Sequence, residues 1–365
     1  MNELSRLVDD TLAAPLGAAR RCAAAGERVI GLLGSDIPTE LVAASGALAL
    51  QLPAMADQPT PDADRYVETV FSPTARSVAQ QWLEGDLDFL DTVVMSRAND
   101  SAQRLYYYVC ELRRRRLTAG PRLLIYDLSK IPRPASLTHT LQATERLAQQ
   151  LGARRDALAA AITQRNRRRA AFAALSAQRS TPAPPLGSTV ARLSRASDLC
   201  TADIFDAALA AWLKETRAAG TGPRLLLAGS APPDERLHVL IESAGGCVVG
   251  EAGEHSLARL GSAVDNSDDP LRSLAAHYHE LPYGPRAFAD RAADIAQQVG
   301  RCRAQGVILW VIEEDESMVW DLPGITRTLG DARVPLLALS RRRWDARDDT
   351  GERIAAFVAS LQVSP

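Results

Sequence analysis

Short runs of apolar residues are the clearest pattern along this chain. Several of them, such as Leu-Leu-Ile-Tyr at residues 123–126, lack the alternation of apolar and polar positions that marks a half-exposed strand. Runs of this kind are typical of parallel strands, because helices cover both faces of a parallel sheet. The pattern predicts strands at Arg28–Leu33, Thr92–Met95, Arg122–Tyr126, Arg224–Ala228, Cys247–Val249, Val307–Ile312 and Pro335–Leu339.

Amphipathic segments separate these strands and predict helices. In such a segment the apolar residues recur every three or four positions, which places them on one face of a helix. The alternation of strands with helices indicates an α/β fold with parallel sheets. The predicted helices cover Thr39–Leu50, Ser101–Arg115, Ala135–Gln150, Arg154–Arg179, Asp234–Ala244 and Asp321–Leu329.

The order of these elements repeats in two halves of the chain. Residues 26–38 align with residues 222–233, and each segment is a predicted strand that ends in Gly-Ser before a helix. Residues 93–101 align with residues 309–317, where Asn-Asp-Ser in the first copy matches Asp-Glu-Ser in the second. The repeat predicts two related parallel-sheet domains of the flavodoxin-like or Rossmann-like type.

A proline-rich stretch, Ser180–Gly187, is the clearest interruption between the two halves. Proline and glycine at this density end regular elements and mark a connection. We therefore predict an N-terminal α/β domain over residues 1–185 and a C-terminal α/β domain over residues 186–365. The N-terminal domain would carry a helical extension at about residues 135–180, which connects the two.

The composition narrows the class of protein. The chain has 365 residues, 46% of them hydrophobic and 24% charged, which is enough for two domains that each bury a core. A net charge of -2 gives no general attraction to nucleic acid. No apolar stretch approaches the ~20 residues of a membrane-spanning helix, and Met1–Asp10 lacks the features of a signal peptide. We expect a cytoplasmic protein that binds neither nucleic acid nor membranes.

The five cysteines are scattered along the chain without C-x-x-C or similar spacing. In a protein of this compartment, free cysteines of this kind are typically small buried apolar residues. They are Cys22, Cys110, Cys200, Cys247 and Cys302.

Two Gly-Ser turns are candidate anion sites. Gly34-Ser35 and Gly229-Ser230 each join a predicted strand to a helix. Glycine permits a tight turn there, and a helix N-terminus offers free N–H groups to an anion such as a CoA phosphate. Neither turn has the pattern of a dinucleotide-binding loop or a P-loop, and helix initiation explains both equally well.

Three segments resemble the signatures of one family. They read F-S-P-T-A-R-S at Phe71–Ser77, N-D-S-A-Q-R-L-Y at Asn99–Tyr106 and G-V-I-L-W-V-I-E-E-D-E at Gly306–Glu316. They resemble the benzoyl-CoA reductase and 2-hydroxyacyl-CoA dehydratase family, which includes the 2-hydroxyglutaryl-CoA dehydratase D-component. The segments I-P-T-E-L-V-A-A-S-G at Ile37–Gly46 and R-I-A-A-F at Arg353–Phe357 resemble further marks of that family, so the likeness covers most of the chain.

In that family each of the three segments carries a cysteine that binds one [4Fe-4S] cluster, whereas these positions here hold Ser72, Asn99 and Asp315. Thiolate is the usual protein ligand of such a cluster, and hydroxyl, amide and carboxylate groups are harder oxygen donors. The resemblance therefore implies a scaffold that has lost its cluster ligands. We expect this chain to bind no metal and no other cofactor.

The resemblance also implies partners. Members of the family form heterodimers that act on acyl-CoA thioesters, and an ATP-dependent activator protein supplies an electron at low potential. The chain would then be a cluster-free subunit of a dehydratase or reductase complex that contributes structure or part of an acyl-CoA pocket. A paralogous partner would hold the [4Fe-4S] cluster and receive the activator. The alternative is a free-standing acyl-CoA or small-ligand binding protein, or a non-redox enzyme, with a repurposed pocket.

A polar pocket is expected where relatives hold the cluster. Ligands of open α/β sheets bind at the carboxyl ends of strands, where all three segments fall. We expect Ser72, Asn99 and Asp315 to line this pocket. The planar guanidinium of Arg76 would pair with a carboxylate or phosphate of a ligand. The other candidates are Asp100, Ser101, Glu314 and Glu316.

Two simpler interpretations of these residues stay open. Asp100 and Ser101 follow a strand and precede a helix, and so do Asp315 and Glu316, which is typical of helix N-caps. The acidic run Glu313–Glu316 could hold a hard divalent cation, although adjacent carboxylates on a loop are more often only solvated.

Overall fold

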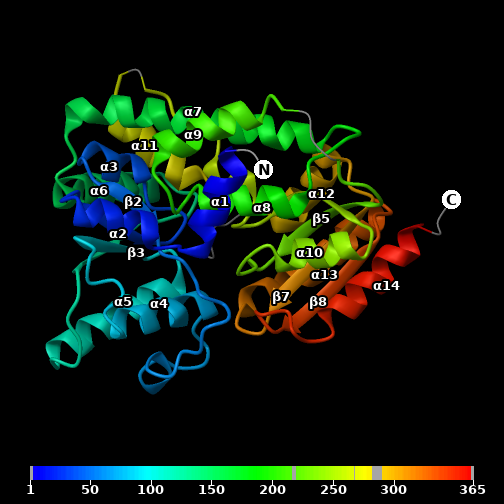
Figure 1. Cartoon of the computed structure of the whole chain (residues 1–365), viewed down its shortest axis with the longest axis horizontal. Helices are drawn as coiled ribbons and strands as arrows, with labels where there is room; N and C mark the ends of the chain where they lie inside the picture. Colours follow the sequence, from blue (N-terminus) through cyan, green and yellow to red (C-terminus); the bar gives the residue numbers. More distant parts are fainter. Residues whose placement is uncertain (1–2, 216–218, 267, 282–289, 363–365) are drawn as a thin grey trace. The chain divides into compact units, whose positions relative to one another are not determined.

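Two four-stranded parallel sheets form the framework of the protein (Figure 1). The computed structural model describes residues 3–215, 219–266, 268–281 and 290–362. The predicted α/β fold with parallel sheets is confirmed. The first sheet has the order β2-β1-β3-β4 and contains β1 (Val29–Leu33), β2 (Leu48–Gln51), β3 (Thr92–Ser96) and β4 (Arg122–Tyr126). The second has the order β6-β5-β7-β8 and contains β5 (Arg224–Gly229), β6 (Cys247–Ala252), β7 (Gly306–Ile312) and β8 (Leu336–Arg342).

The strand order is the same in both sheets, as the internal repeat predicts. In each sheet the first strand pairs with the second strand on one side and with the third on the other. This makes β1 equivalent to β5, and β3 equivalent to β7. The switch point, where successive strands are added on opposite sides, lies between β1 and β3 in the first sheet and between β5 and β7 in the second.

The helix predicted over Thr39–Leu50 is wrong in its second half. Helix α3 covers only Thr39–Ala44, and the strand β2 follows it. Gly46 lies between them with a φ of 76°, a left-handed conformation that glycine adopts without strain and that commonly ends helices. The sequence Leu-Ala-Leu after it suits a helix by propensity, but pairing with β1 makes it an edge strand.

The other predicted helices form with bounds shifted by a few residues. They are α5 (Asp100–Arg114), α6 (Pro134–Leu151), α7 (Arg155–Arg179), α10 (Arg236–Ser243) and α13 (Glu316–Asp331). The remaining helices were not predicted, because frequent alanine and arginine blur the apolar period in them. These are α1 (Glu3–Ala13), α2 (Gly17–Ala24), α4 (Pro73–Leu83), α8 (Gly187–Ala196), α9 (Ala202–Trp212), α11 (Pro270–Glu280), α12 (Arg291–Cys302) and α14 (Thr350–Gln362), with short 3-10 turns at Ala63–Arg65 and Leu257–Leu260.

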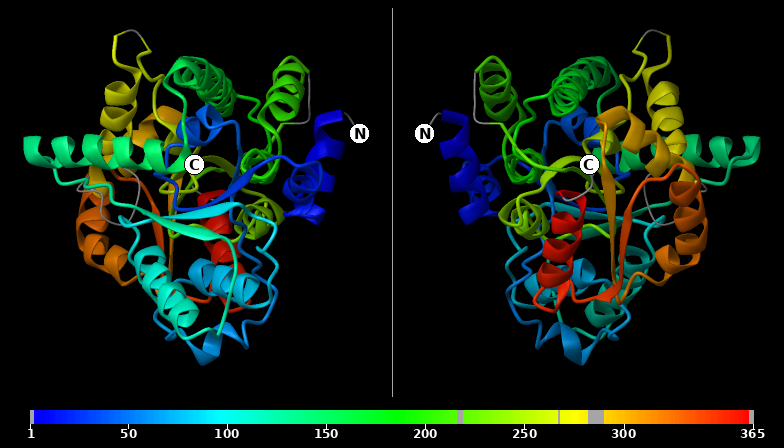
Figure 2. Two further views of the ribbon diagram at one scale, coloured as in Figure 1. Left: turned by 90° about the vertical axis from the view of Figure 1, so that its left-hand side faces the viewer. Right: turned by 90° about the vertical axis from the view of Figure 1, so that its right-hand side faces the viewer.

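Helices cover both faces of each sheet (Figures 1 and 2). On the first sheet, one core layer joins the strands to α3, α6, α7 and α11, and the other joins them to α2, α4 and α5. On the second sheet, α12 and α13 pack on one face and α10 and α14 on the other. Burial on both faces explains the uninterrupted apolar runs in the strands.

The chain divides into two compact units that each contain one sheet. The first unit contains Met1–Ala171, Ala196–Leu209 and Leu260–Phe288. The second contains Phe172–Arg195, Ala210–Arg259 and Ala289–Pro365. Each unit therefore includes segments from both halves of the sequence.

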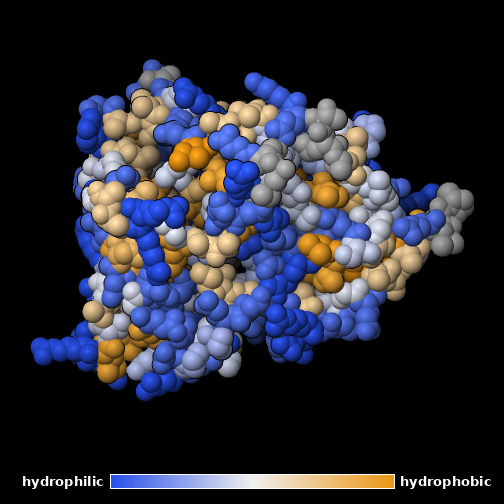
Figure 3. All heavy atoms as spheres, viewed as in Figure 1, coloured by the Kyte–Doolittle hydropathy of each residue, from blue (hydrophilic) through white to orange (hydrophobic). Residues whose placement is uncertain are grey.

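Hydrophilic residues dominate the face drawn in Figure 3, with smaller hydrophobic patches between them. None of the described helices combines the length and the apolar character that crossing a membrane requires.

Candidate functional site

Ser72 lies immediately before helix α4. Its hydroxyl oxygen accepts a hydrogen bond from the backbone N–H of Ala75 at 3.3 Å, which makes Ser72 the N-cap of this helix. Pro73 at the first helical position suits this start, because the N–H that proline lacks would have no helical partner there. The side chain of Ser72 is therefore used to begin α4.

Asn99 has the same role at helix α5. Its side-chain amide oxygen accepts a hydrogen bond from the backbone N–H of Ala102 at 2.9 Å. The backbone N–H of Ser72 donates to the hydroxyl oxygen of Ser101 at 3.0 Å, which joins the first turns of α4 and α5. The structure thus brings Ser72, Asn99 and Ser101 together.

The cap of α5 differs from the simpler interpretation of the sequence. Asp100 and Ser101 are the first two residues of the helix, and the residue before them is the cap. Asp100 is exposed in the first turn, where a carboxylate interacts favourably with the positive end of the helix dipole.

Asp315 is the N-cap of helix α13. Its Oδ1 accepts hydrogen bonds from the backbone N–H of Met318 at 3.4 Å and from the hydroxyl of Ser317 at 3.0 Å. Its Oδ2 accepts a hydrogen bond from the hydroxyl of Ser230 at 2.8 Å. The capping interpretation is confirmed for Asp315, whereas Glu316 is the first residue of the helix.

Serine, asparagine and aspartate thus cap three helices at the positions where the resemblance leads us to expect cysteine. These residue types are preferred at N-caps, because a short oxygen-bearing side chain reaches the unpaired N–H groups of the first turn. Cysteine sulfur is a weaker acceptor. Ser72 and Asn99 belong to the first unit and Asp315 to the second, so the convergence of all three stays a prediction.

A serine–aspartate hydrogen bond spans the switch point of each sheet. In the first sheet the hydroxyl of Ser96, at the end of β3, donates to Oδ2 of Asp36 at 2.9 Å. In the second sheet Ser230, just after β5, donates to Asp315, which follows β7, and accepts the backbone N–H of Ile312 at 3.2 Å. The crevice in which related folds bind ligands is bridged in both sheets by the chain's own side chains.

The two Gly-Ser turns lie beside these hydrogen bonds. Gly34 and Gly229 have φ values of 136° and 108°, in the range that favours glycine. A Cβ on Gly229 would lie 2.1 Å from the carbonyl oxygen of Trp310, so only glycine fits. A carboxylate, Asp36 or Asp315, faces each turn and would repel an incoming anion. Anion binding at Gly34-Ser35 or Gly229-Ser230 gains no support from this geometry.

Arg76 is engaged within the protein. Its guanidinium forms an ion pair with Asp64 at 2.5 Å, and about a quarter of its side chain is exposed. Arg104 of α5 is engaged as well: it pairs with Glu68 at 2.8 Å and lies 4.4 Å above the centre of the Phe71 ring. A ligand anion at Arg76 would have to displace or share the carboxylate of Asp64.

The acidic segment before α13 is partly exposed. Glu313 and Glu316 are exposed, and Glu314 and Asp315 are half-buried. Within the described ranges, no three histidine, cysteine, aspartate or glutamate side chains are grouped closely enough to hold a metal ion. One carboxylate oxygen of Asp315 already accepts a hydrogen bond from Ser230. The acidic segment therefore offers a divalent cation fewer free oxygen ligands than its sequence suggests.

The cysteines lie in separate elements and do not form a ligand set. Cys22 is on α2, Cys110 on α5, Cys247 on β6 and Cys302 at the end of α12, and Cys200 precedes α9. Burial raises the pKa of Cys200 to about 11 and also raises the pKa of the Cys247 and Cys302 thiols. These three side chains are protonated at neutral pH, and a cluster ligand must be a thiolate. The residues present do not fit a [4Fe-4S] cluster.

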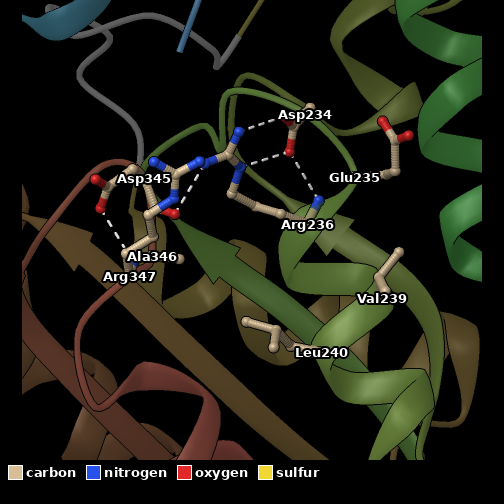
Figure 4. Close-up of a pocket in the computed structure, with 8 residues that line it drawn as sticks. All are labelled: Asp234, Glu235, Arg236, Val239, Leu240, Asp345, Ala346 and Arg347. Atoms are coloured by element: carbon tan, nitrogen blue, oxygen red, sulfur yellow. Dashed lines mark hydrogen bonds and ion pairs between the residues drawn. The ribbon is translucent and has the colours of Figure 1, made fainter. Parts of the chain in front are cut away.

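An open hollow of about 420 Å³ lies at the carboxyl edge of the second sheet (Figure 4). Its floor includes Val239 and Leu240 of α10, and acidic and basic side chains form its rim. Arg236 crosses the hollow, with hydrogen bonds to both oxygens of Asp234 and to the carbonyl oxygen of Asp345. The other lining residues are Glu235, Ala346 and Arg347.

Sequence reasoning missed this hollow. Its residues come from the loops after β5 and β8 and from α10, which follows the first of these loops. Ligands bind at such strand ends in related folds, so the position of these residues in the chain was an available signal. Ala346 also has a φ of 52°, which is uncommon for a residue other than glycine and tends to occur at functional sites.

A buried ion-pair network in the first unit was also missed. Glu40 is 1% exposed and accepts hydrogen bonds from Arg169 at 2.6 Å and from the hydroxyl of Tyr278 at 2.9 Å. Burial alone would raise the pKa of Glu40, but Arg169 and Arg165 hold it below its ordinary value. The network joins α3, α7 and α11, so Glu40 in the I-P-T-E-L segment has a structural role.

A second network lies inside the second unit. Both oxygens of Glu251 bind the guanidinium of Arg179, and Oε1 also contacts Nε2 of His238 at 3.0 Å. His255 lies near this network, with both ring nitrogens shielded from solvent and burial lowering its pKa to about 4. His255 is therefore neutral at pH 7.

One comparison with known proteins gives a match across most of the chain. The family model described as 2-hydroxyglutaryl-CoA dehydratase, D-component, matches residues 35–361. The match begins at Ser35 and includes the three helix caps and the hollow. A search of curated proteins found no match.

Proposed function

The chain belongs to the 2-hydroxyglutaryl-CoA dehydratase D-component family, and from this premise we propose that it is a cluster-free subunit of a dehydratase-type complex. A paralogous partner would hold the [4Fe-4S] cluster and receive the ATP-dependent activator. This chain would supply structure or part of an acyl-CoA pocket. Members of the family work in complexes with partner components, which fits a heteromeric assembly.

The three helix caps are the observation that carries this proposal. Ser72, Asn99 and Asp315 each direct an oxygen to the N–H groups of the helix that follows. A residue that caps a helix in this way satisfies a group that would otherwise be unpaired. At the three positions where the family has cysteine thiolates, the capping side chains stabilise the starts of α4, α5 and α13. This supports a chain that folds without a cluster.

Anaerobic co-expression tests the assembly. The tagged chain is expressed with a cysteine-bearing member of the family, purified, and the separated chains are assayed for iron and acid-labile sulfide. We expect the two chains to co-purify, with iron and sulfide confined to the partner. Stoichiometric iron and sulfide on this chain would refute the cluster-free assignment, and failure of the wild-type chain to bind the partner would refute the assembly.

Restoring the thiolates tests the three positions directly. We expect the triple variant Ser72→Cys, Asn99→Cys, Asp315→Cys to bind iron after anaerobic reconstitution, because it returns three soft ligands. The variant Asn99→Cys alone is the matched control and should bind none. Equal iron content in the two variants would show that these positions do not form one site.

A free-standing ligand-binding protein is the second candidate. The hollow beside Asp234 and Asp345 favours it, because its volume lies within the range of small-molecule sites. Titration of the isolated chain with a CoA thioester in a calorimeter tests this candidate. Binding by the wild-type chain that is weakened in Val239→Asp would support it, and the absence of heat without a partner would count against it.

A further inference from the structure

Trp320 has the highest exposed fraction among the large hydrophobic side chains that the structure describes, at 85%. Three of the other tryptophans, Trp82, Trp212 and Trp310, are at most 5% exposed. A tryptophan left in water in this way is a strong candidate for an interface anchor, because tryptophan dominates the binding energy of many interfaces. We propose that the outward face of α13 around Trp320 is the docking surface for the cluster-bearing paralogous subunit.

The neighbours of Trp320 extend its apolar surface. Val319 is 42% exposed, and Pro323 and Gly324 are exposed one turn further along the helix. A Cβ added to Gly324 would meet no atom within 4 Å, so a partner can approach the backbone there. Pro323 has no N–H to donate to the carbonyl oxygen of Val319, four residues earlier. That oxygen can accept a hydrogen bond from a donor on a partner.

One unpaired carboxylate borders the same face. Glu316 is exposed and forms no ion pair with any residue of the described part of the chain. Glu316 lies four residues before Trp320, so the two side chains are neighbours on the helix surface. Asp321, by contrast, is already paired with Arg291. The unpaired carboxylate of Glu316 and the open carbonyl oxygen of Val319 can both accept hydrogen bonds from donors on the partner.

This pattern defines the chemistry of the partner surface. It requires a recess lined by apolar side chains for the indole ring, with a lysine or arginine side chain at its edge facing Glu316. The inference rests on the proposed function, which supplies the paralogous subunit as the occupant. It adds the residues that would recognise that subunit.

Binding measurements with the purified paralogous subunit test the surface. We expect Trp320→Ala to raise the Kd at least about tenfold, as for a central interface anchor. Glu316→Lys should slow association and make it less sensitive to salt, because it removes an attractive charge. Tyr107→Ala is the matched control, since Tyr107 is also an exposed aromatic residue, at 56%, on another helix. It should bind like the wild type.

The outcomes separate the two proposals. Wild-type binding that is unchanged in Trp320→Ala overturns this surface and leaves the proposed function intact. No binding by the wild-type chain overturns the proposed function itself. A wild-type homodimer that Trp320→Ala dissociates overturns the choice of partner, because the occupant is then a second copy. If Trp320→Ala does not fold, Glu316→Lys at the exposed helix start carries the test.

Discussion

Removal of the carboxylate of Asp315 should destabilise the second unit by a predictable amount. In Asp315→Ala the N–H of Met318 loses its cap, which costs about 1 kcal/mol. The hydroxyl of Ser230, which is 7% exposed, loses the acceptor for its proton, and an unsatisfied buried donor costs about 1–2 kcal/mol more. We expect a loss of about 2–3 kcal/mol in the free energy of unfolding of this unit.

Urea denaturation followed by tryptophan fluorescence measures this loss. Of the five tryptophans, Trp82 lies in the first unit and the other four lie in the second, so the signal reports mainly on the second unit. Asp331→Ala is the matched control, because Asp331 is exposed at the other end of the same helix, where a carboxylate contributes no cap. A difference below about 0.5 kcal/mol between the two variants would refute the capping argument.

Three further predictions concern other parts of the structure. Glu40→Ala should destabilise the first unit by about 3–5 kcal/mol, because the buried charge of Arg169 loses its carboxylate partner, and urea unfolding at pH 7 measures this loss. In the folded protein the pKa of His255 is lowered from about 6.5 to about 4. Between these pH values the unfolded state binds a proton on His255 and the folded state does not, so the free energy of unfolding should fall as the pH drops from about 6.5 to about 4. His255→Gln should flatten this part of the stability profile, and an unchanged slope would contradict it. Gly229→Ala should prevent stable folding, whereas Gly324→Ala should raise helix stability by up to about 1 kcal/mol, as judged by thermal unfolding of the two variants.

The strands were predictable from the sequence because burial on both faces leaves a strong local pattern. Arg122–Tyr126 has the same bounds in the sequence prediction and in the structure. The strand β2 could not be recognised in the same way, because Leu-Ala-Leu-Gln is short and favours a helix by propensity. Its conformation is decided by pairing with β1, which is not a local property.

The candidate site was predictable only in part. The sequence indicated that Asp315 could be a cap, and its neighbours in the chain were sufficient for that inference. The hydrogen bond from Ser230 joins residues 85 positions apart, and the bond from Tyr278 to Glu40 joins residues 238 positions apart. No local pattern encodes contacts of such long range, which explains why the Ser230–Asp315 bond and the Glu40 network were missed.

The interleaving of the two units has a consequence for how the protein is made. The chain passes from one unit to the other after residues 171, 195, 209, 259 and 288. Helix α11, which supplies Tyr278 to the first unit, is synthesised after both strands β5 and β6 of the second. The first unit cannot be completed during synthesis until α11 has been translated, because the network of Glu40 and Arg169 also includes Tyr278 of that helix. The N-terminal half of the chain therefore cannot fold to completion before the C-terminal half is made. Cutting the chain at its midpoint would give two fragments, each of which lacks part of both units.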